Sequence, residues 1–230
     1  MRKYRHLFRN NISNMVKEAQ RLNATDYQKK RYTDYIKRLM DIVLSGVALL
    51  VLLPFFCLLG LIIKLDSPGP VIFSQQRVGK NGQLFRMYKF RSMVVDAEKL
   101  LPSLTNQNEA SGPLFKIKKD PRITRVGRIL RKTSLDEFPQ LWNVFNGDMS
   151  LVGPRPALPS EVAQYTEFQR QRLLIKPGCS GLWQVCGRSN VDFETMIALD
   201  LLYLKERCLF FDLLVMFKTI GQLIYSKTAY

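Results

Sequence analysis

The amino-acid sequence predicts a mainly helical α+β protein, attached to one face of a membrane through a bent, re-entrant helix near its N-terminus and through interfacial amphipathic helices. Residues 42–63 are 22 uncharged, mostly apolar residues between Asp41 and Lys64. Pro54 stands at the middle of this run, and lysines and arginines lie on both sides of it. We therefore expect three parts: a basic lead-in (1–35), a re-entrant membrane helix (36–66) and a C-terminal domain (67–230).

The uncharged run is long enough to cross a bilayer. As one helix it measures ~33 Å, against a hydrocarbon core of ~30 Å. Pro54 removes a backbone hydrogen bond and kinks the helix, which leaves two halves of ~15–18 Å that are each too short to cross. Since both flanks are basic, the positive-inside rule favours no direction of crossing. We expect both ends on the cytoplasmic side; a straight crossing is the alternative, because spanning helices tolerate proline.

A second apolar stretch, from Leu209 to Ile224, closes the chain. Asp212 and Lys218 interrupt it. These charges favour a buried or interfacial helix over a second membrane span.

The composition narrows the classes of function. The formal net charge is +16, from 35 Lys and Arg against 19 Asp and Glu. So basic a chain suits an anionic partner, namely nucleic acid, a membrane surface or a phosphorylated substrate. The four cysteines form no CxxC pair, and the single histidine, His6, lies in a polar N-terminal stretch. These counts argue against a zinc site, a disulfide framework and a Ser-His or Cys-His mechanism.

The most basic stretch runs from Lys116 to Lys132 and contains eight Lys or Arg and one acid, Asp120. Arginines recur at every third position from Arg122 to Arg131, with apolar residues between them. This spacing predicts an amphipathic helix with a basic face. The alternative role for such a face is simple solvation.

Two adjacent carboxylates follow this stretch. Ser134-Leu-Asp-Glu137 matches a capping box, which predicts a new helix whose first turn carries Asp136 and Glu137. The helix dipole would favour both carboxylates in their ionised form. Adjacent ionised carboxylates beside a cationic stripe can hold a hard metal ion such as Mg²⁺ and face a phosphate. The alternative is that both acids only cap the helix.

Arg155 lies between two prolines, within Gly147-Asp-Met-Ser-Leu-Val-Gly-Pro-Arg-Pro156. Proline on both sides restricts the backbone that presents this guanidinium. A rigidly presented arginine suits bidentate phosphate recognition. A stiff loop with a surface arginine is the alternative.

From Tyr35 to Ile224 the chain resembles the bacterial sugar transferases, the monotopic polyprenyl-phosphate phosphoglycosyl transferases. The matching blocks come in the family's order. They are Lys37-Arg38, Asp41, Pro54, Gln76-Arg77-x-Gly79, Tyr88-Lys-Phe-Arg-Ser-Met93, Thr124-x-x-Gly127-x-x-Leu130-Arg131, Ser134-Leu-Asp-Glu137, Asn143-x-x-x-Gly147 through Pro156, Lys176-Pro-Gly178, Gly181-Leu-Trp-Gln184, Gly187-Arg188, Asp200-x-x-Tyr203 and Asp212-Leu.

The resemblance implies that residues 67–230 are a catalytic domain on the cytoplasmic face of a bacterial inner membrane. Its reaction would move a sugar-1-phosphate from a UDP-sugar to polyprenyl (undecaprenyl) phosphate and release UMP. Asp136 would be the nucleophile and form a covalent phosphosugar, while Glu137 with Asp136 would position Mg²⁺. The remaining substrate-binding residues it implies are Arg155, Lys89, Arg131, Asp212, Gln184 and Arg188. Within this set, Lys89 is the expected partner of Asp212, since a lone acid in an apolar helix needs one.

Two departures from the family pattern bear on substrate choice. The family commonly reads Gly-Arg-Asn after the glutamine, whereas this chain has Gly187-Arg188-Ser189-Asn190, and Cys186 replaces a small polar residue. The block around Gln184 resembles the hexose-1-phosphate members, so UDP-glucose and UDP-galactose are the expected donors, with N-acetylated sugars still open. The chain is expected to be the compact form, without the N-terminal transmembrane helices of larger relatives.

The expected pathway is the first membrane step of exopolysaccharide, capsule or O-antigen assembly. A second copy of the chain and downstream glycosyltransferases are further candidate partners, and nucleic acid is not expected. The competing hypothesis is a membrane-tethered nucleic-acid binder, which explains the charge but gives no role to the acidic pair or the bent apolar segment. A non-catalytic scaffold for glycan assembly would not need Asp136 and Glu137.

Overall fold

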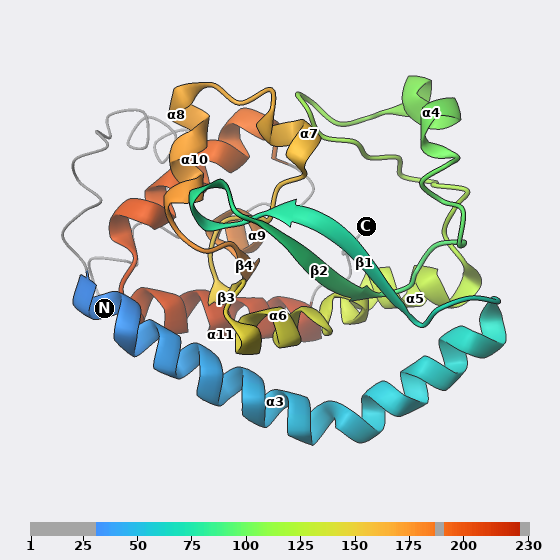
Figure 1. The fold of residues 1–230 in the computed structure, drawn as a ribbon, viewed down its shortest axis with the longest axis horizontal. Helices are drawn as coiled ribbons and strands as arrows, with labels where there is room; N and C mark the ends of the chain where they lie inside the picture. Colours follow the sequence, from blue (N-terminus) through green and yellow to red (C-terminus); the bar gives the residue numbers. More distant parts are fainter. Residues whose placement is uncertain (1–30, 187–190, 226–230) are drawn as a thin grey trace.

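The computed structural model describes residues 31–186 and 191–225, and Figure 1 shows their arrangement. The helices of this part are α3 (Arg31–Asp66), α4 (Leu101–Leu104), α5 (Arg125–Thr133), α6 (Gln140–Asn146), α7 (Pro159–Val162), α8 (Glu167–Arg170), α9 (Leu182–Cys186), α10 (Phe193–Glu206) and α11 (Leu209–Tyr225). The strands are β1 (Ile72–Val78), β2 (Leu84–Phe90), β3 (Ser150–Val152) and β4 (Gly178–Ser180). Short 3₁₀ turns are η2 (Lys80–Gly82), η3 (Thr105–Gln107), η4 (Leu135–Glu137) and η5 (Gln171–Leu174). The prediction of a mainly helical α+β fold is confirmed.

The strands form two small sheets. β1 and β2 pair antiparallel, from Ile72 opposite Phe90 to Val78 opposite Leu84. Their turn contains Asn81 and Gly82 with φ of 56° and 82°, the left-handed conformations that a tight hairpin of this kind requires. β3 and β4 pair in parallel.

The hydrophobic core is built around α10. Every residue of this helix from Met196 to Leu204 is buried, including Asp200 and Tyr203. Strand β3 and helices α9 and α11 pack around it. α11 has two faces, because Phe211 and Val215 are buried while Phe217 is 72% exposed. Leu209–Ile224 is therefore an amphipathic helix rather than a uniformly buried one.

The long helix α3 lies along one side of the domain and bends near its middle, as Figure 1 shows. It begins at Arg31, earlier than the expected residue 36, and contains Pro54. Helices α5, α6 and α11 lie against it. The bend lets the two halves of α3 contact different parts of the same domain.

The first half of α3 contacts the domain through polar side chains, and the second half contacts it through apolar side chains. In the first half, Lys37, Asp41 and Ser45 are buried against the domain. In the second half the buried residues are Leu59 and Ile63, which pack with apolar side chains of β2 and α5. Within the described residues, α3 is the one helix that is long and apolar enough to cross a membrane.

Candidate active site

Asp136 and Glu137 lie on the 3₁₀ turn η4, between α5 and α6. The predicted capping box is wrong. Ser134 adopts the left-handed conformation (φ 58°, ψ 18°) as the C-cap of α5, and its side chain caps no helix. A residue in this conformation ends the preceding helix rather than starting the next one. α6 begins only at Gln140, so neither carboxylate lies in its first turn.

Helix α5 holds this turn close to the hairpin. Gly127 makes the approach possible, because a Cβ atom there would lie 2.0 Å from the carbonyl oxygen of Ser92. The N-terminus of α5 is capped twice: Thr124 Oγ1 accepts from Gly127 N at 2.9 Å, and Asp66 Oδ2 accepts from Val126 N at 3.1 Å. The carboxylates therefore follow a short helix that is fixed at both ends.

Asn143 fixes β2 against α6 from the other side. Its Nδ2 donates to the carbonyl oxygen of Arg86 at 2.7 Å, and its Oδ1 accepts from Tyr88 N at 3.0 Å. The side chain is fully buried. Lys89 follows directly in the strand, so this clamp fixes the backbone that presents the Lys89 ammonium to the carboxylates.

Lys89 pairs with Glu137, with Nζ 2.6 Å from Oε1. The side chains are 25% and 35% exposed, so the pair is open to solvent and to a ligand. Arg131, at the end of α5, and Arg155 also lie near enough for their charges to act on Glu137. Of the predicted substrate-binding residues, the structure places Lys89, Arg131 and Arg155 near the two carboxylates.

The two carboxyls differ in acidity. Burial raises the pKa of Asp136 to about 6, the Lys89 charge opposes this, and the neighbouring Glu137 adds to it. Burial also raises the pKa of Glu137, but Lys89 and the two arginines outweigh it, so that this pKa lies below its usual value. Glu137 is therefore the stronger acid of the two, whereas Asp136 takes up a proton as the pH falls to about 6.

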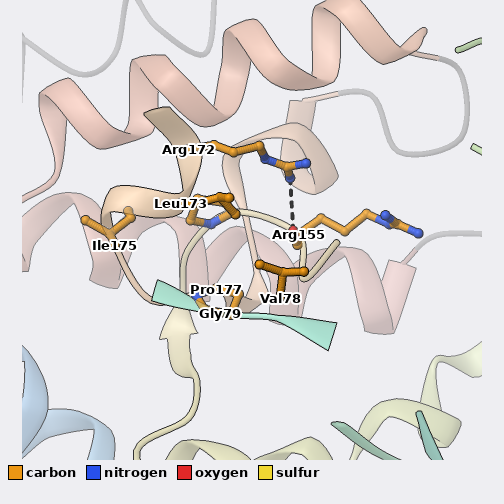
Figure 2. A pocket seen from close by; sticks show the side chains of 8 residues that line it. Val78, Gly79, Arg155, Arg172, Leu173, Ile175 and Pro177 are labelled. Carbon is orange, nitrogen blue, oxygen red and sulfur yellow. Dashed lines mark hydrogen bonds between the residues drawn. The ribbon is translucent and has the colours of Figure 1, made fainter. Parts of the chain in front are cut away.

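Arg155 is held by a buried carboxylate. Its Nη1 lies 2.9 Å and 3.2 Å from the two oxygens of Glu161, and Glu161 also accepts from Leu158 N at 2.9 Å. The main chain of Arg155 is fixed as well, since its carbonyl oxygen accepts from Arg172 at 3.0 Å. Figure 2 shows the side chain of Arg155 pointing away from the small pocket that Val78, Gly79 and Arg172 help to line. The guanidinium is thus both oriented and partly exposed.

Arg77 also lies close to this site, although its sequence block predicted no role for it. Its Nη1 donates to the carbonyl oxygen of Pro156 at 3.0 Å, and Nη2 donates to Gln75 Oε1 at 2.6 Å. Burial, followed by the charge of Arg155, lowers the pKa of Arg77 to about 10. Its membership in the Gln76-Arg77-x-Gly79 block was the available signal. Four cations thus act on Glu137 through their charges, and Glu161 offsets part of the charge of Arg155. Four cations against the three carboxylates of Asp136, Glu137 and Glu161 still leave an excess of positive charge, which suits phosphate groups.

The other three predicted substrate-binding residues are Asp212, Gln184 and Arg188, and none of them is shown beside the two carboxylates by the part of the chain that the structure describes. The pairing of Asp212 with Lys89 is wrong: Asp212 is fully buried between α3 and α11, where Lys37 Nζ lies 2.7 Å away and Tyr203 Oη donates at 2.6 Å. Gln184 lies on α9, which contacts α10 and α11. Arg188 is outside the described residues.

Two adjacent carboxylates are the type of ligand that Mg²⁺ prefers. Within the described ranges no group of three or more His, Cys, Asp or Glu side chains could hold a metal. Mg²⁺ needs no such group, because it commonly takes one or two carboxylates and completes its octahedron with phosphate and water. Asp136 and Glu137 would supply those carboxylates.

A carboxylate pair among several cations suits a protein that acts on phosphate groups, and the same domain carries a long apolar helix with an exposed face. Residues 32–226 match the bacterial sugar transferases, and the chain belongs to this family.

Its relatives carry related names. The chain is 44% identical over 201 residues to "Galactosyl transferase CpsE" of Streptococcus agalactiae, covering 87% of this chain and 43% of the relative. It is 42% identical over 221 residues to "Undecaprenyl-phosphate galactose phosphotransferase" of Salmonella typhimurium, covering 93% and 45%. "Exopolysaccharide production protein ExoY" of Rhizobium meliloti is 39% identical over 198 residues, covering 84% and 88%. The chain thus spans about half the length of the first two relatives and most of the third.

Proposed function

We propose that this chain transfers a hexose-1-phosphate from a UDP-sugar to undecaprenyl phosphate, releases UMP, and thereby begins the assembly of an exopolysaccharide, capsule or O-antigen type glycan. The observation that carries this proposal is the buried Asp136 beside Glu137, with four cations around them and an apolar helix at the same domain. The name of the Salmonella relative supports galactose as the sugar and undecaprenyl phosphate as the lipid.

The first chemical step uses Asp136 as a nucleophile. A carboxylate oxygen of Asp136 attacks the phosphorus that carries the sugar, and the bond from this phosphorus to the oxygen of UMP breaks. UMP leaves with the electron pair, and the sugar-phosphate remains on Asp136 as an acyl phosphate. A pKa of about 6 suits this role, because the carboxylate is ionised at neutral pH and still more nucleophilic than an ordinary aspartate.

The second step regenerates the free carboxylate of Asp136. A phosphate oxygen of the lipid attacks the same phosphorus, the bond to Asp136 breaks, and a polyprenyl diphosphate sugar leaves. Lys89, Arg131, Arg155 and Arg77 neutralise the phosphate oxygens in both steps, and phosphoryl transfer depends on such charge neutralisation and positioning. Mg²⁺ bound at Asp136 and Glu137 would add to this neutralisation.

We further infer that α3 enters the cytoplasmic leaflet of the inner membrane and returns. Both of its ends are tied to one domain: Asp34 Oδ1 lies 2.8 Å from Arg207 Nη1, and Asp66 accepts from α5 at 3.1 Å. Between these ends the outer face is apolar and open, with Leu50 76% and Val51 71% exposed. Exposed Trp142 on α6 and Phe217 on α11 extend this surface, as expected of interfacial helices.

The topology is tested with single cysteines at exposed positions on the two sides of the bend, Tyr35 and Gln83, in a chain whose native cysteines are replaced. We expect neither to react with an impermeant thiol reagent added to intact cells. Both should react once the cells are opened. Labelling of either position from outside would mean that α3 crosses the membrane.

The reaction is tested by incubating the purified protein with undecaprenyl phosphate, Mg²⁺ and one UDP-sugar at a time. We expect UMP release with UDP-galactose or UDP-glucose, a lower rate with N-acetylated sugars, and no release in EDTA. The competing nucleic-acid hypothesis predicts salt-sensitive DNA binding with no UMP release from any donor. UMP release that continues in EDTA would contradict the metal assignment alone.

A further inference from the structure

A third carboxylate lies behind the cations of the active site. Glu161, on α7, is 2% exposed, and both of its oxygens accept from Arg155 Nη1, at 2.9 Å and 3.2 Å. So buried a carboxylate has almost no surface to offer a substrate or a metal ion. An effect of Glu161 on the reaction would therefore have to pass through the side chain that it holds.

The hairpin connects α7 to the catalytic pair. α7 packs against β1, where Val78 N donates to the carbonyl oxygen of Ala157 at 2.9 Å. β1 pairs with β2, and β2 contacts η4 and carries Lys89, which is bonded to Glu137. Glu161 is thus joined to the active site by one continuous set of packed elements.

Glu161 occupies only one corner of the Arg155 guanidinium. Both of its bonds use Nη1, and among the described residues Nε and Nη2 of Arg155 have no hydrogen-bond partner. The Arg155 side chain is 27% exposed, and Figure 2 shows it pointing away from the neighbouring pocket. A guanidinium binds a phosphate through two parallel N–H groups, so the edge formed by Nε and Nη2 is available to a ligand.

The backbone of Arg155 is held independently of Glu161. Its carbonyl oxygen accepts from Arg172 Nη2 at 3.0 Å, and Arg172 is paired with Asp200 in the core. The next carbonyl oxygen, that of Pro156, accepts from Arg77 Nη1 at 3.0 Å. Loss of the Glu161 carboxylate should therefore leave the loop in place and release only the guanidinium.

A second bond of Glu161 offers a purely structural explanation. Its Oε2 also accepts from Leu158 N at 2.9 Å, which satisfies one of the N–H groups at the start of α7. A glutamine fills this capping role as well as a glutamate. The negative charge has a further effect: burial and then the charge of Arg155 lower the pKa of Arg77, and the charge of Glu161 opposes both. The carboxylate thus favours two like charges side by side.

We propose that Glu161 is a positioning residue for the transfer reaction, which orients the Arg155 guanidinium so that its available edge meets the diphosphate of the UDP-sugar. This inference rests on the proposed function. Glu161 itself touches no substrate, so its contribution should disappear when Arg155 is absent. A residue that only caps α7 would contribute equally with and without Arg155.

The test is a double-mutant cycle between Glu161→Gln and Arg155→Gln, read as kcat/KM for UDP-galactose with undecaprenyl phosphate and Mg²⁺ present. We expect Glu161→Gln to lower kcat/KM about tenfold, the size of one charge-assisted hydrogen bond, and Arg155→Gln to lower it about 100-fold. The double variant should match Arg155→Gln to within about twofold. Glu167→Gln, which removes the same charge from the exposed start of α8, should match the wild type.

Glu161→Asp is the second variant, in the same two backgrounds, for the case that Glu161→Gln does not fold. It keeps a carboxylate in the same place but withdraws it by one methylene, so we expect the same dependence on Arg155. Equal losses from the Glu161 substitution in both backgrounds would overturn the proposal, as would a kcat/KM unchanged from the wild type. Wild-type protein that releases no UMP from any donor would overturn the proposed function instead, before any variant is compared.

Discussion

Two ion pairs of this protein, Lys37–Asp212 and Lys89–Glu137, have nearly the same N–O distance but different surroundings. Their N–O distances are 2.7 Å and 2.6 Å. Asp212 is 1% exposed in its side chain, and Lys37 and Tyr203 occupy its two oxygens. Glu137 is 35% exposed and faces more cations than carboxylates. A closed and balanced pair holds elements together, whereas an open and unbalanced one can bind a ligand.

The closed pair explains how α3 is fastened to the domain. Tyr203 donates to Asp212 and lies 3.0 Å from the carbonyl oxygen of Val152, so one network joins α3, α10, α11 and β3. The open pair lies at the meeting point of short elements, η4 and the end of β2. Lys37 and Asp41 on α3 thus have a structural role, since they pair with Asp212 and with the main chain of Leu151.

The largest effect is expected at Asp136, which lies beside the open Lys89–Glu137 pair. Asp136→Asn should lower kcat by several orders of magnitude, because an amide cannot attack phosphorus and the site acts as a unit. Circular dichroism and the unfolding temperature should stay near those of the wild type. Asp96→Asn, at an exposed position, serves as the control. A variant at Asp136 that keeps more than about a tenth of wild-type kcat would contradict the nucleophile role.

Replacing Lys37 should mainly lower the stability of the protein, whereas replacing Lys89 should mainly lower its activity. Lys37→Met leaves the Asp212 carboxylate buried without its partner, which should destabilise the protein by about 3–5 kcal/mol. Lys89→Met should leave stability closer to wild type but lower kcat about 100-fold, because it removes charge that acts on the reacting phosphates. Unfolding in denaturant and UMP release measure the two effects. Equal losses of stability in the two variants would remove the distinction between a closed and an open pair.

The acidity of Asp136 predicts a pH dependence of the first step. Because its pKa is raised to about 6, the carboxylate takes up a proton below that pH, and the rate of the UMP burst should fall about tenfold per pH unit there. Glu137→Gln removes a negative charge that raises this pKa, so at a saturating Mg²⁺ concentration it should move the acid limb to lower pH. An acid limb that stays in place in this variant would argue against coupling between the two carboxyls.

The smallest of these effects concerns the metal. Glu137→Gln replaces a hard anionic oxygen with a neutral amide, so it should raise the Mg²⁺ concentration for half-maximal activity about tenfold. Glu167→Gln, at an exposed position, changes the charge equally and should leave the requirement unchanged. The measurement is a Mg²⁺ titration at saturating UDP-sugar, and overlapping curves for the two variants would contradict the role of Glu137.

Local patterns predicted much of this molecule. The apolar run with Pro54 and the adjacent carboxylates are short-range features, and the structure contains both. The basic helix is confirmed only from Arg125 onward, because Arg122 precedes α5 and is buried in an ion pair with Asp120. The hairpin was missed although Asn81-Gly82 is its usual signal. The capping box failed because Ser134 ends α5 in the left-handed conformation, which takes it out of the N-cap position that its sequence motif predicts.

The partners of charged residues could not be predicted in this way. Lys37 and Asp212 are 175 residues apart, and nothing in one sequence indicates that they meet. Judged by charge alone, Lys89 was an equally good candidate for the partner of Asp212. Arg77 was missed for the same reason, since its place beside Arg155 follows from how the hairpin packs on the loop after β3. Such pairings depend on tertiary packing rather than on spacing.

The central claim, that Asp136 carries the sugar-phosphate during the reaction, is tested most directly by rapid quenching and intact-protein mass spectrometry. Protein mixed with UDP-galactose and Mg²⁺, without lipid, should release up to one equivalent of UMP and gain the mass of one galactose phosphate. Hydroxylamine should remove this mass, as expected of an acyl phosphate, and Asp136→Asn should never acquire it. If wild-type protein releases UMP only when the lipid is present and carries no added mass at any quench time, the lipid attacks the donor directly and Asp136 is not the nucleophile.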